Sequence, residues 1–184
     1  MSEFVISTRY ANALMEISEE KNSFERTLED MELVNQTLLN SKDLKNVLQN
    51  PIISSDKKST ILEEVFASHI SEGVKNFLKL IVNKGRENIL LEISNRFLEL
   101  CDEKLNRTKV QISSAIELSD EQKENIAKKL EEITNKKIIS EYNIDNSIIG
   151  GFKARFGDTI IDASVKHQLE LLKKKLFEQN YLSN

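Results

Sequence analysis

The 184-residue sequence predicts a multi-domain protein of mixed class, α followed by α+β. The first domain, residues 1–105, is an all-α six-helix bundle, and the second, residues 106–184, is a small β-α-β-β-β-α two-layer domain. Apolar residues recur with a helical period of 3.6 up to about residue 105 and then alternate, as strand residues do. The charge balance changes at the same place, since residues 1–105 carry 13 basic and 18 acidic side chains and residues 106–184 carry 13 and 12.

The first helix is indicated by one apolar stripe that follows an N-cap at Ser2. The stripe consists of Ile6, Tyr10, Ala13, Leu14 and Ile17. Five more helices are expected, beginning near Ser23, after Ser41, after Ser54 and Ser55, after Ser71 and near residue 87. Asn50 and Pro51 end the third helix, and Lys84 with Gly85 ends the fifth. The sixth, about 87–105, is apolar on more than one face, which favours the middle of the bundle.

The second domain begins after Asn106, where the period changes. The expected strands are 108–116, 138–144, 148–156 and 159–161, with a tight hairpin turn at Gly157 and Asp158. Ser119 and Gln122 form a capping box that opens a helix after the first strand. Its inward residues are Ile126, Leu130 and Ile133, and the last helix, about 164–180, has a narrow seam of Val165, Leu169, Leu172 and Leu176. We therefore expect a small sheet with two helices on one face.

Composition excludes several classes of function. A formal net charge of −4 argues against general nucleic-acid binding and against adsorption to anionic lipid, because both need a basic surface. No segment approaches the ~18 apolar residues of a membrane span, so no direct membrane insertion is expected. The first ten residues lack the features of a signal peptide, and we expect the mature chain to begin here. Cys101 is the only cysteine, which excludes an intrachain disulfide.

Residue types that carry chemistry are sparse. His69 and His167 have no partner at metal-ligand spacing, so no metal is expected. Gly150 and Gly151 lack the residues of a phosphate loop, and paired glycines in a strand pattern mark a bulge or a close approach of another backbone. Lys173 to Lys175 lie opposite the last helix's seam, as a solvated face does. We expect no catalytic residue, no cofactor and no small-molecule ligand.

One feature has two interpretations from the residues alone. The first and fifth helices carry apolar residues beyond those of a single face, namely Phe4, Val5, Ala11, Leu80 and Val82. Such a surplus is typical of an acceptor groove for a partner's amphipathic helix. It is equally typical of helices that are buried more deeply in the bundle.

Several segments in order along the whole chain carry a resemblance to a known family. They are RYANAL at Arg9 to Leu14, NPII at Asn50 to Ile53, NKGR at Asn83 to Arg86, SAIELS at Ser114 to Ser119, DNSIIGGF at Asp145 to Phe152, and GDTIIDASV at Gly157 to Val165. This ordered set resembles the delta subunit family of F-type ATP synthases, whose mitochondrial counterpart is the oligomycin-sensitivity-conferring protein. Asn146 and Ala163 depart from it, because the family commonly has proline and glycine there.

The resemblance implies a non-catalytic stator subunit of the peripheral stalk, which links the catalytic head to the membrane-anchored stalk so that proton-driven rotation is coupled to ATP synthesis. It implies that residues 1–105 bind the N-terminal helix of an alpha subunit and that residues 106–184 bind the C-terminal end of the b subunit. The implied place is the cytoplasmic face of the bacterial plasma membrane, as a peripheral protein. The alternatives are a helical adaptor or regulatory module unrelated to ATP synthase and an enzyme that uses Cys101.

The resemblance also selects the groove interpretation, because the family uses its first and fifth helices for this contact. The expected groove residues are Tyr10, Ala13, Leu14, Ile17, Phe77, Leu78 and Ile81. On the b-subunit side, the residues expected to bind the partner or to shape the contact are Gly150, Gly151, Asp162 and Val165.

Overall fold

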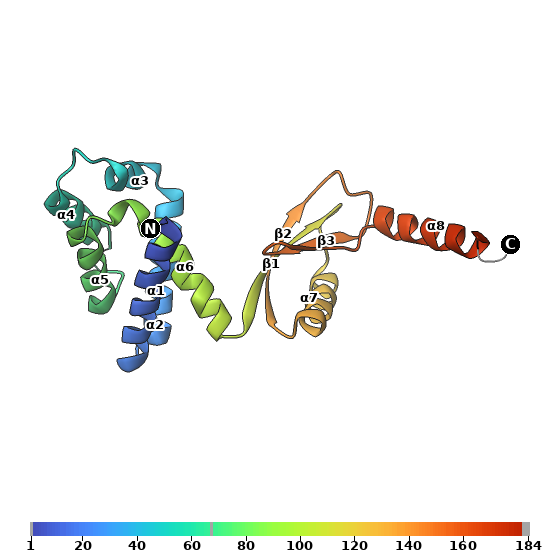
Figure 1. Ribbon diagram of the computed structural model, residues 1–184, viewed down its shortest axis with the longest axis horizontal. Helices are drawn as coiled ribbons and strands as arrows, with labels where there is room; N and C mark the ends of the chain where they lie inside the picture. Colours follow the sequence, from blue (N-terminus) through green and yellow to red (C-terminus); the bar gives the residue numbers. More distant parts are fainter. Residues whose placement is uncertain (1, 67, 182–184) are drawn as a thin grey trace. The chain divides into compact units, whose positions relative to one another are not determined.

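The computed structural model describes residues 2–66 and 68–181, with side chains up to Lys175, and it divides into two compact units, Met1–Lys104 and Leu105–Asn184 (Figure 1). Each unit has its own hydrophobic core. The described part of the first unit is helical, and that of the second holds a four-stranded sheet and two helices. The mixed class predicted from the sequence, helices with a small sheet, is confirmed.

The first unit packs its helices around one continuous core. The elements are α1 (Glu3–Glu20), α2 (Phe24–Asn40), α3 (Lys42–Gln49), α4 (Ser55–Phe66), α5 (Glu72–Asn83), a 3₁₀ turn η1 (Glu87–Ile89) and α6 (Leu90–Lys104). α6 packs against both α1 and α2, and α4 packs against α5. Ile93, Phe97 and Cys101 of α6 are fully buried, as expected of a helix that is apolar on several sides.

Local signals in the sequence account for the helix ends. The hydroxyl of Ser41 accepts a hydrogen bond from the N–H of Leu44 at 3.2 Å, which satisfies one free donor at the start of α3. α5 ends at Asn83 and is followed by Gly85, whose φ of +62° is accessible to glycine with little strain. The N–H of Arg86 then donates to the carbonyl of Ile81 at 3.0 Å and closes the last turn. Both helix ends agree with the sequence-based predictions.

The second unit contains β1 (Arg107–Ser114), α7 (Asp120–Thr134), β2 (Lys137–Ile144), β3 (Phe152–Phe156), β4 (Thr159–Asp162) and α8 (Val165–Tyr181). The strand order is β2-β1-β3-β4, in which β1 and β2 are parallel and the other pairs are antiparallel. α7 connects the parallel pair and starts with the predicted capping box, since Ser119 and Gln122 exchange side-chain-to-backbone hydrogen bonds. Ile126 and Leu130 of α7 pack on the sheet core.

Two expectations about the second unit are wrong in detail. The third strand was expected at 148–156, but β3 begins at Phe152, because the N–H of Ile148 closes a turn onto the carbonyl of Asp145 and Gly151 has a φ of +79° that no strand allows. Gly150 and Gly151 therefore lie in bends before the strand. Ile133 was expected to point inward and is exposed, because it lies in the last turn of α7, beyond the buried Leu130.

The expectation that the last helix covers the sheet is also wrong. Leu169 and Leu172 are 60% and 54% exposed, and Figure 1 shows α8 running away from the sheet. Ile126 and Leu130 of α7 already cover the small core of the sheet, and the apolar seam of α8 does not pack against it. The side chain of Leu176, the fourth residue of this seam, lies outside the described residues.

The connection between the two units is short. The Lys104 ammonium pairs with Glu19 and lies 4.9 Å from the centre of the Phe24 ring, which ties the end of α6 to the first unit. Asn106, with a φ of +49°, donates from its side chain to the carbonyl of Asn135 at 3.1 Å, which ties it to the second unit. Only one residue of the chain separates these two tethered positions.

Candidate functional site

The first unit presents an apolar stripe on α1 beside the face that is buried against the core. Its residues, which we call the α1 flank, are Ile6, Tyr10, Ala13 and Ile17. Ile6 and Tyr10 are half-buried, whereas Ala13 is exposed and Ile17 is 45% exposed. Leu14 lies next to this stripe but belongs to the core, with 3% exposure. The α1 flank is therefore apolar surface that the rest of the unit only partly covers.

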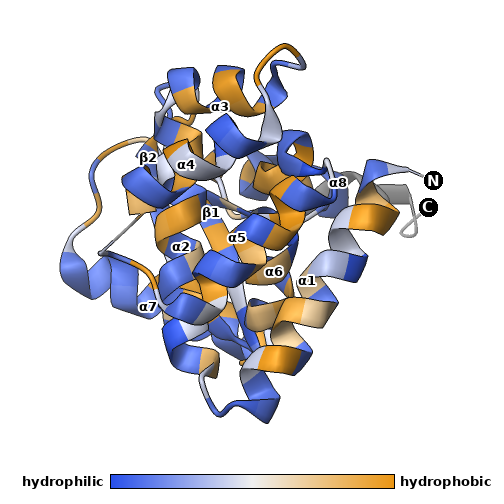
Figure 2. Cartoon of the chain, turned by 90° about the vertical axis from the view of Figure 1, so that its left-hand side faces the viewer, coloured by the Kyte–Doolittle hydropathy of each residue, from blue (hydrophilic) through white to orange (hydrophobic). Residues whose placement is uncertain are grey.

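α5 contributes less surface than the sequence suggested. Phe77, Leu78 and Ile81 are all buried in the core of the first unit. Leu80 is the exposed apolar residue of α5, at 44%. Figures 1 and 2 agree in placing α1 beside α5, and Figure 2 shows hydrophobic residues along both helices. Of the seven residues expected to form the groove, Ala13 and Ile17 are exposed and Tyr10 is half-buried, whereas Leu14, Phe77, Leu78 and Ile81 lie in the core.

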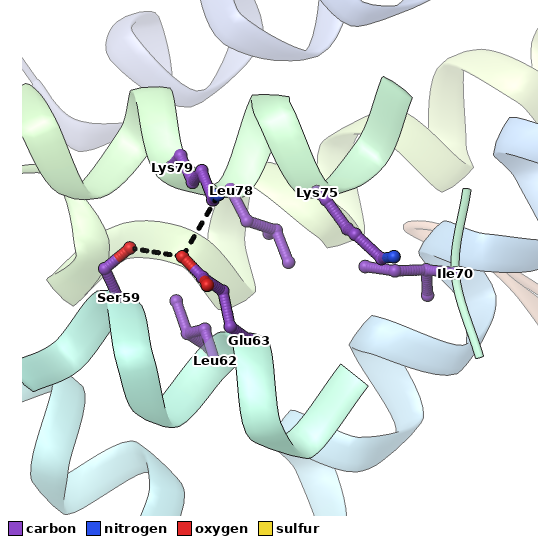
Figure 3. Close-up of a pocket in the computed structure, with 7 residues that line it drawn as sticks. All are labelled: Ser59, Leu62, Glu63, Ile70, Lys75, Leu78 and Lys79. Atoms are coloured by element: carbon purple, nitrogen blue, oxygen red, sulfur yellow. Dashed lines mark hydrogen bonds and ion pairs between the residues drawn. The ribbon is translucent and has the colours of Figure 1, made fainter. Parts of the chain in front are cut away.

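Leu78 points to the other side of α5. Figure 3 shows it directed toward Leu62 of α4. Nearby, Glu63 of α4 accepts a hydrogen bond from Ser59 and pairs with Lys79 of α5. The pocket between these two helices has a volume of about 10 Å³, roughly that of one water molecule. Leu78 therefore packs between α5 and α4.

The four residues expected on the b-subunit side come together at the start of α8. The carbonyl of Gly150 accepts a hydrogen bond from the N–H of Val165 at 2.9 Å. A Cβ added to Gly150 would meet Val165 Cγ2 at 3.1 Å, and one added to Gly151 would collide with the Ala163 carbonyl oxygen and lie 3.0 Å from Ser164 Cα. Gly151 is thus required for the close approach of this loop to the helix start, whereas a Cβ at Gly150 would require the Val165 side chain to shift slightly.

Asp162 completes this junction. Its Oδ1 accepts a hydrogen bond from the N–H of Ser164 at 2.9 Å, and its Oδ2 lies 3.6 Å from the Lys153 ammonium. Hydrogen bonding to Ser164 is the main cause that lowers the pKa of Asp162, with smaller contributions from the charges of Lys153 and His167. The Ser164 hydroxyl in turn accepts from the N–H of His167 at 3.3 Å, so Ser164 caps α8. We call Gly150, Gly151, Asp162, Ser164 and Val165 together the α8 junction.

A concave apolar surface adjoins the α8 junction. A pocket of about 310 Å³ lies between the end of β1, the start of α7 and residues 149–151, which we call the glycine loop. Ile116, Ile126, Gly150 and Phe152 are among the residues that line it. Ile149 at its edge is 83% exposed. Sequence reasoning missed this surface, because it assigned Ile116 and Ile149 to strands.

Groups able to perform chemistry are not assembled in the described parts of the chain. Residues 2–66 and 68–181 contain no cluster of three or more His, Cys, Asp or Glu side chains able to hold a metal ion. The Cys101 thiol is fully buried in the helical core, out of reach of a substrate. Over the same residues, no helix combines the length and the apolar character needed to cross a membrane.

Comparison with known proteins gives one consistent result. The sequence model of the family described as "ATP synthase delta (OSCP) subunit" matches residues 6–176. ATP synthase subunit delta of Chlorobium phaeovibrioides is 42% identical over 176 residues, which cover 96% of this chain and 97% of that protein. ATP synthase subunit delta of Chlorobaculum tepidum is 39% identical over 179 residues, covering 97% and 99%.

A solved structure shares the fold. It is a chain of the Toxoplasma gondii mitochondrial ATP synthase hexamer, with a TM-score of 0.69 and 20% identity, covering 93% of this chain and 97% of that one. The family match spans nearly the whole chain, and the curated relatives match it over almost their full length. The chain therefore belongs to the ATP synthase delta (OSCP) subunit family.

Proposed function

We propose that this chain, as a non-catalytic peripheral-stalk subunit of an F-type ATP synthase, makes two separate contacts that hold the catalytic head still against the rotor. Its first unit binds the N-terminal helix of an alpha subunit, and its second unit binds the C-terminal end of the b subunit. The complex lies at the cytoplasmic face of the bacterial plasma membrane. The observation that carries this proposal is that each unit has a complete core of its own and still exposes a stripe of apolar helix surface.

The alpha-subunit contact is assigned to the α1 flank together with Leu80 of α5. An amphipathic helix binds by placing its apolar face on residues spaced along a helix, and the α1 flank repeats at such spacing over three turns. Leu14, Phe77 and Ile81 lie beneath this surface in the core and hold it in place. Their burial means that they contribute through packing, whereas Tyr10, Ala13 and Ile17 contact the partner directly.

The b-subunit contact is assigned to the exposed face of α8 and the adjoining pocket. Val165, Leu169 and Leu172 lie on one side of α8 and are exposed. The α8 junction fixes where this helix begins, because the Gly150 carbonyl accepts a hydrogen bond from Val165, its first residue, and the Asp162 carboxylate accepts one from Ser164, the residue before it. A partner that lies along α8 also reaches the pocket at Ile149. The glycine pair then shapes the contact without supplying side chains to it.

The test measures two affinities of the full-length chain by isothermal titration calorimetry, one for a peptide of the alpha subunit's N-terminal helix and one for the soluble part of the b subunit. Ile17→Asp is expected to weaken the peptide about 30-fold or more and to leave the b subunit unchanged, as loss of an interface anchor does. Leu169→Asp is expected to give the reverse result. The matched controls are Asn12→Asp on α1 and Glu170→Gln on α8, both exposed and outside the two apolar stripes. Reversed effects of the two variants would contradict the assignment of partners to units.

A further inference from the structure

The start of α5 is capped by another helix. Ser71 stands at the N-cap position, but its own hydroxyl accepts no hydrogen bond from the first turn. The N–H of Ser71 donates instead to Oδ2 of Asp30, a residue of α2, at 2.7 Å. A carboxylate at a helix N-terminus is favourable, because it compensates the free N–H groups and the positive end of the helix dipole. Asp30 therefore acts as the anionic cap of α5 from 41 residues away in the sequence.

A second residue of α2 joins this contact. Arg26, one turn before Asp30, places its Nε 3.2 Å from Oδ1 of Asp30. Its Nη2 also donates to the carbonyl of His69 at 3.2 Å. The two side chains thus hold the α4–α5 loop at two backbone groups. The cationic Arg26 binds the carbonyl of His69, and the anionic Asp30 binds the N–H of Ser71. We call Arg26 and Asp30 the α2 clamp.

The α2 clamp caps α5 with a buried charge, which is less favourable than a cap made by a hydroxyl. The side chain of Asp30 is 1% exposed, and burial of a carboxylate is unfavourable unless it is fully paired. A hydroxyl at Ser71 could satisfy the same helix end without any buried charge. Unlike a local cap by the Ser71 hydroxyl, the α2 clamp also fixes the start of α5 relative to α2. The ion pair between Lys79 and Glu63 that ties α5 to α4 is about half exposed, so it constrains α5 less.

We propose that Arg26 and Asp30 are positioning residues for the alpha-subunit contact. By fixing where α5 begins, the α2 clamp sets how Leu80 lies relative to the α1 flank, and so shapes the surface on which the partner helix rests. This inference relies on the proposed function of that surface. Asp30 is buried and does not belong to the exposed stripe, so its influence on binding passes through α5.

The experiment uses the full-length chain and three variants. Asp30→Leu keeps the size of the side chain but removes both acceptor oxygens, and Asp30→Asn keeps one of them. Glu29→Gln is the matched control, because Glu29 is a neighbouring carboxylate that pairs with Arg26 at 3.4 Å but is exposed and does not touch α5. Two quantities are measured for each: amide hydrogen exchange over residues 72–75, and affinity for the alpha-subunit peptide used above.

Asp30→Leu is expected to accelerate exchange in the first turn of α5 and to weaken the affinity for the peptide by about 10-fold, a typical size for coupling between two linked sites. Asp30→Asn is expected to give a smaller change of both quantities, and Glu29→Gln none. Affinity for the b subunit is expected to stay constant in all three, which shows that the second unit is undisturbed.

Two results would overturn the inference. One is fast exchange in the first turn of α5 with unchanged affinity for the peptide, in Asp30→Leu or, if that variant does not fold, in Asp30→Asn. The other is an equal loss of affinity for the b subunit, which indicates general destabilisation. Failure of the unsubstituted chain to bind the peptide would instead refute the proposed function itself, and this outcome is distinct from the other two.

Discussion

The backbone N–H of Val165 donates to the carbonyl of Gly150 at 2.9 Å, and a Cβ on Gly150 would lie only 3.1 Å from Cγ2 of the Val165 side chain. Gly150 and Val165 thus join the glycine loop to the first turn of α8 in two ways, by a backbone hydrogen bond and by close packing. The glycine loop and α8 are consequently one structural element, although they are separated by a two-stranded hairpin in the sequence.

The two glycines with positive φ in the second unit should respond differently to alanine. Gly157→Ala leaves open space around the new methyl group, so only the φ of +55° is strained, at about 1 kcal/mol. Gly151→Ala adds a collision with the backbone at Ala163 and should destabilise the second unit by about 3 kcal/mol or more. Urea unfolding followed by tyrosine fluorescence measures both. Equal losses for the two variants would show that the collision is relieved by a shift of the loop.

Truncation of α1 residues should separate core from surface. Leu14→Ala removes a buried side chain and is expected to lower the free energy of unfolding by about 2–4 kcal/mol. Ile17→Ala, one turn further along the same helix, is expected to cost less than about 1 kcal/mol because its side chain is 45% exposed. Thermal unfolding followed by circular dichroism provides the comparison. A large loss for Ile17→Ala would mean that the α1 flank is covered in solution.

Residues 1–105, expressed alone, should fold. Among the residues that the structure describes, their core draws on α1 to α6 with Ile70 and Ile89, and on none from the second unit. We expect a cooperative thermal transition and an affinity for the alpha-subunit peptide within about twofold of that of the full chain, as for an independent domain. Limited proteolysis gives a second check, since an unfolded fragment would be digested throughout.

The α8 junction should weaken in acid. Because the pKa of Asp162 in the folded chain lies below its ordinary value of 3.8, its stabilising effect is complete above that value and is lost as the pH falls through the lower, native pKa. Asp162→Asn should therefore destabilise the second unit at pH 7 and differ less from the unsubstituted chain as the pH falls below 4. Asp158→Asn, in the exposed hairpin turn, serves as the control. Chemical unfolding of the variants at several pH values measures this difference.

Local features were predictable from the sequence. The start of α3 after Ser41, the glycine end of α5 and the capping box before α7 each depend on residues a few positions apart, and each was predicted in place. The start of β3 was not, because two consecutive isoleucines read as strand residues. In the structure Ile148 is buried below a turn, whereas Ile149 next to it is 83% exposed.

Features that depend on distant parts of the chain could not be predicted. The seam of α8 showed that one face is apolar, but periodicity carries no information about what covers that face. The same holds for Phe77 and Ile81, which the sequence placed in a groove and which lie in the core. The α2 clamp could not be recognised in the sequence. Asp30 binds a backbone N–H, and any residue except proline at position 71 would supply that group.

The single residue between Lys104 and Asn106 has a mechanical consequence. When the two units are held by different partners, the covalent path between those partners runs through the backbone at Leu105, with no slack chain between the two tethered residues to stretch first. The two flanking tethers then carry the load together with the covalent chain. Several glycines inserted after Leu105 should leave both affinities intact yet act as an elastic element in series, which would absorb torque instead of transmitting it.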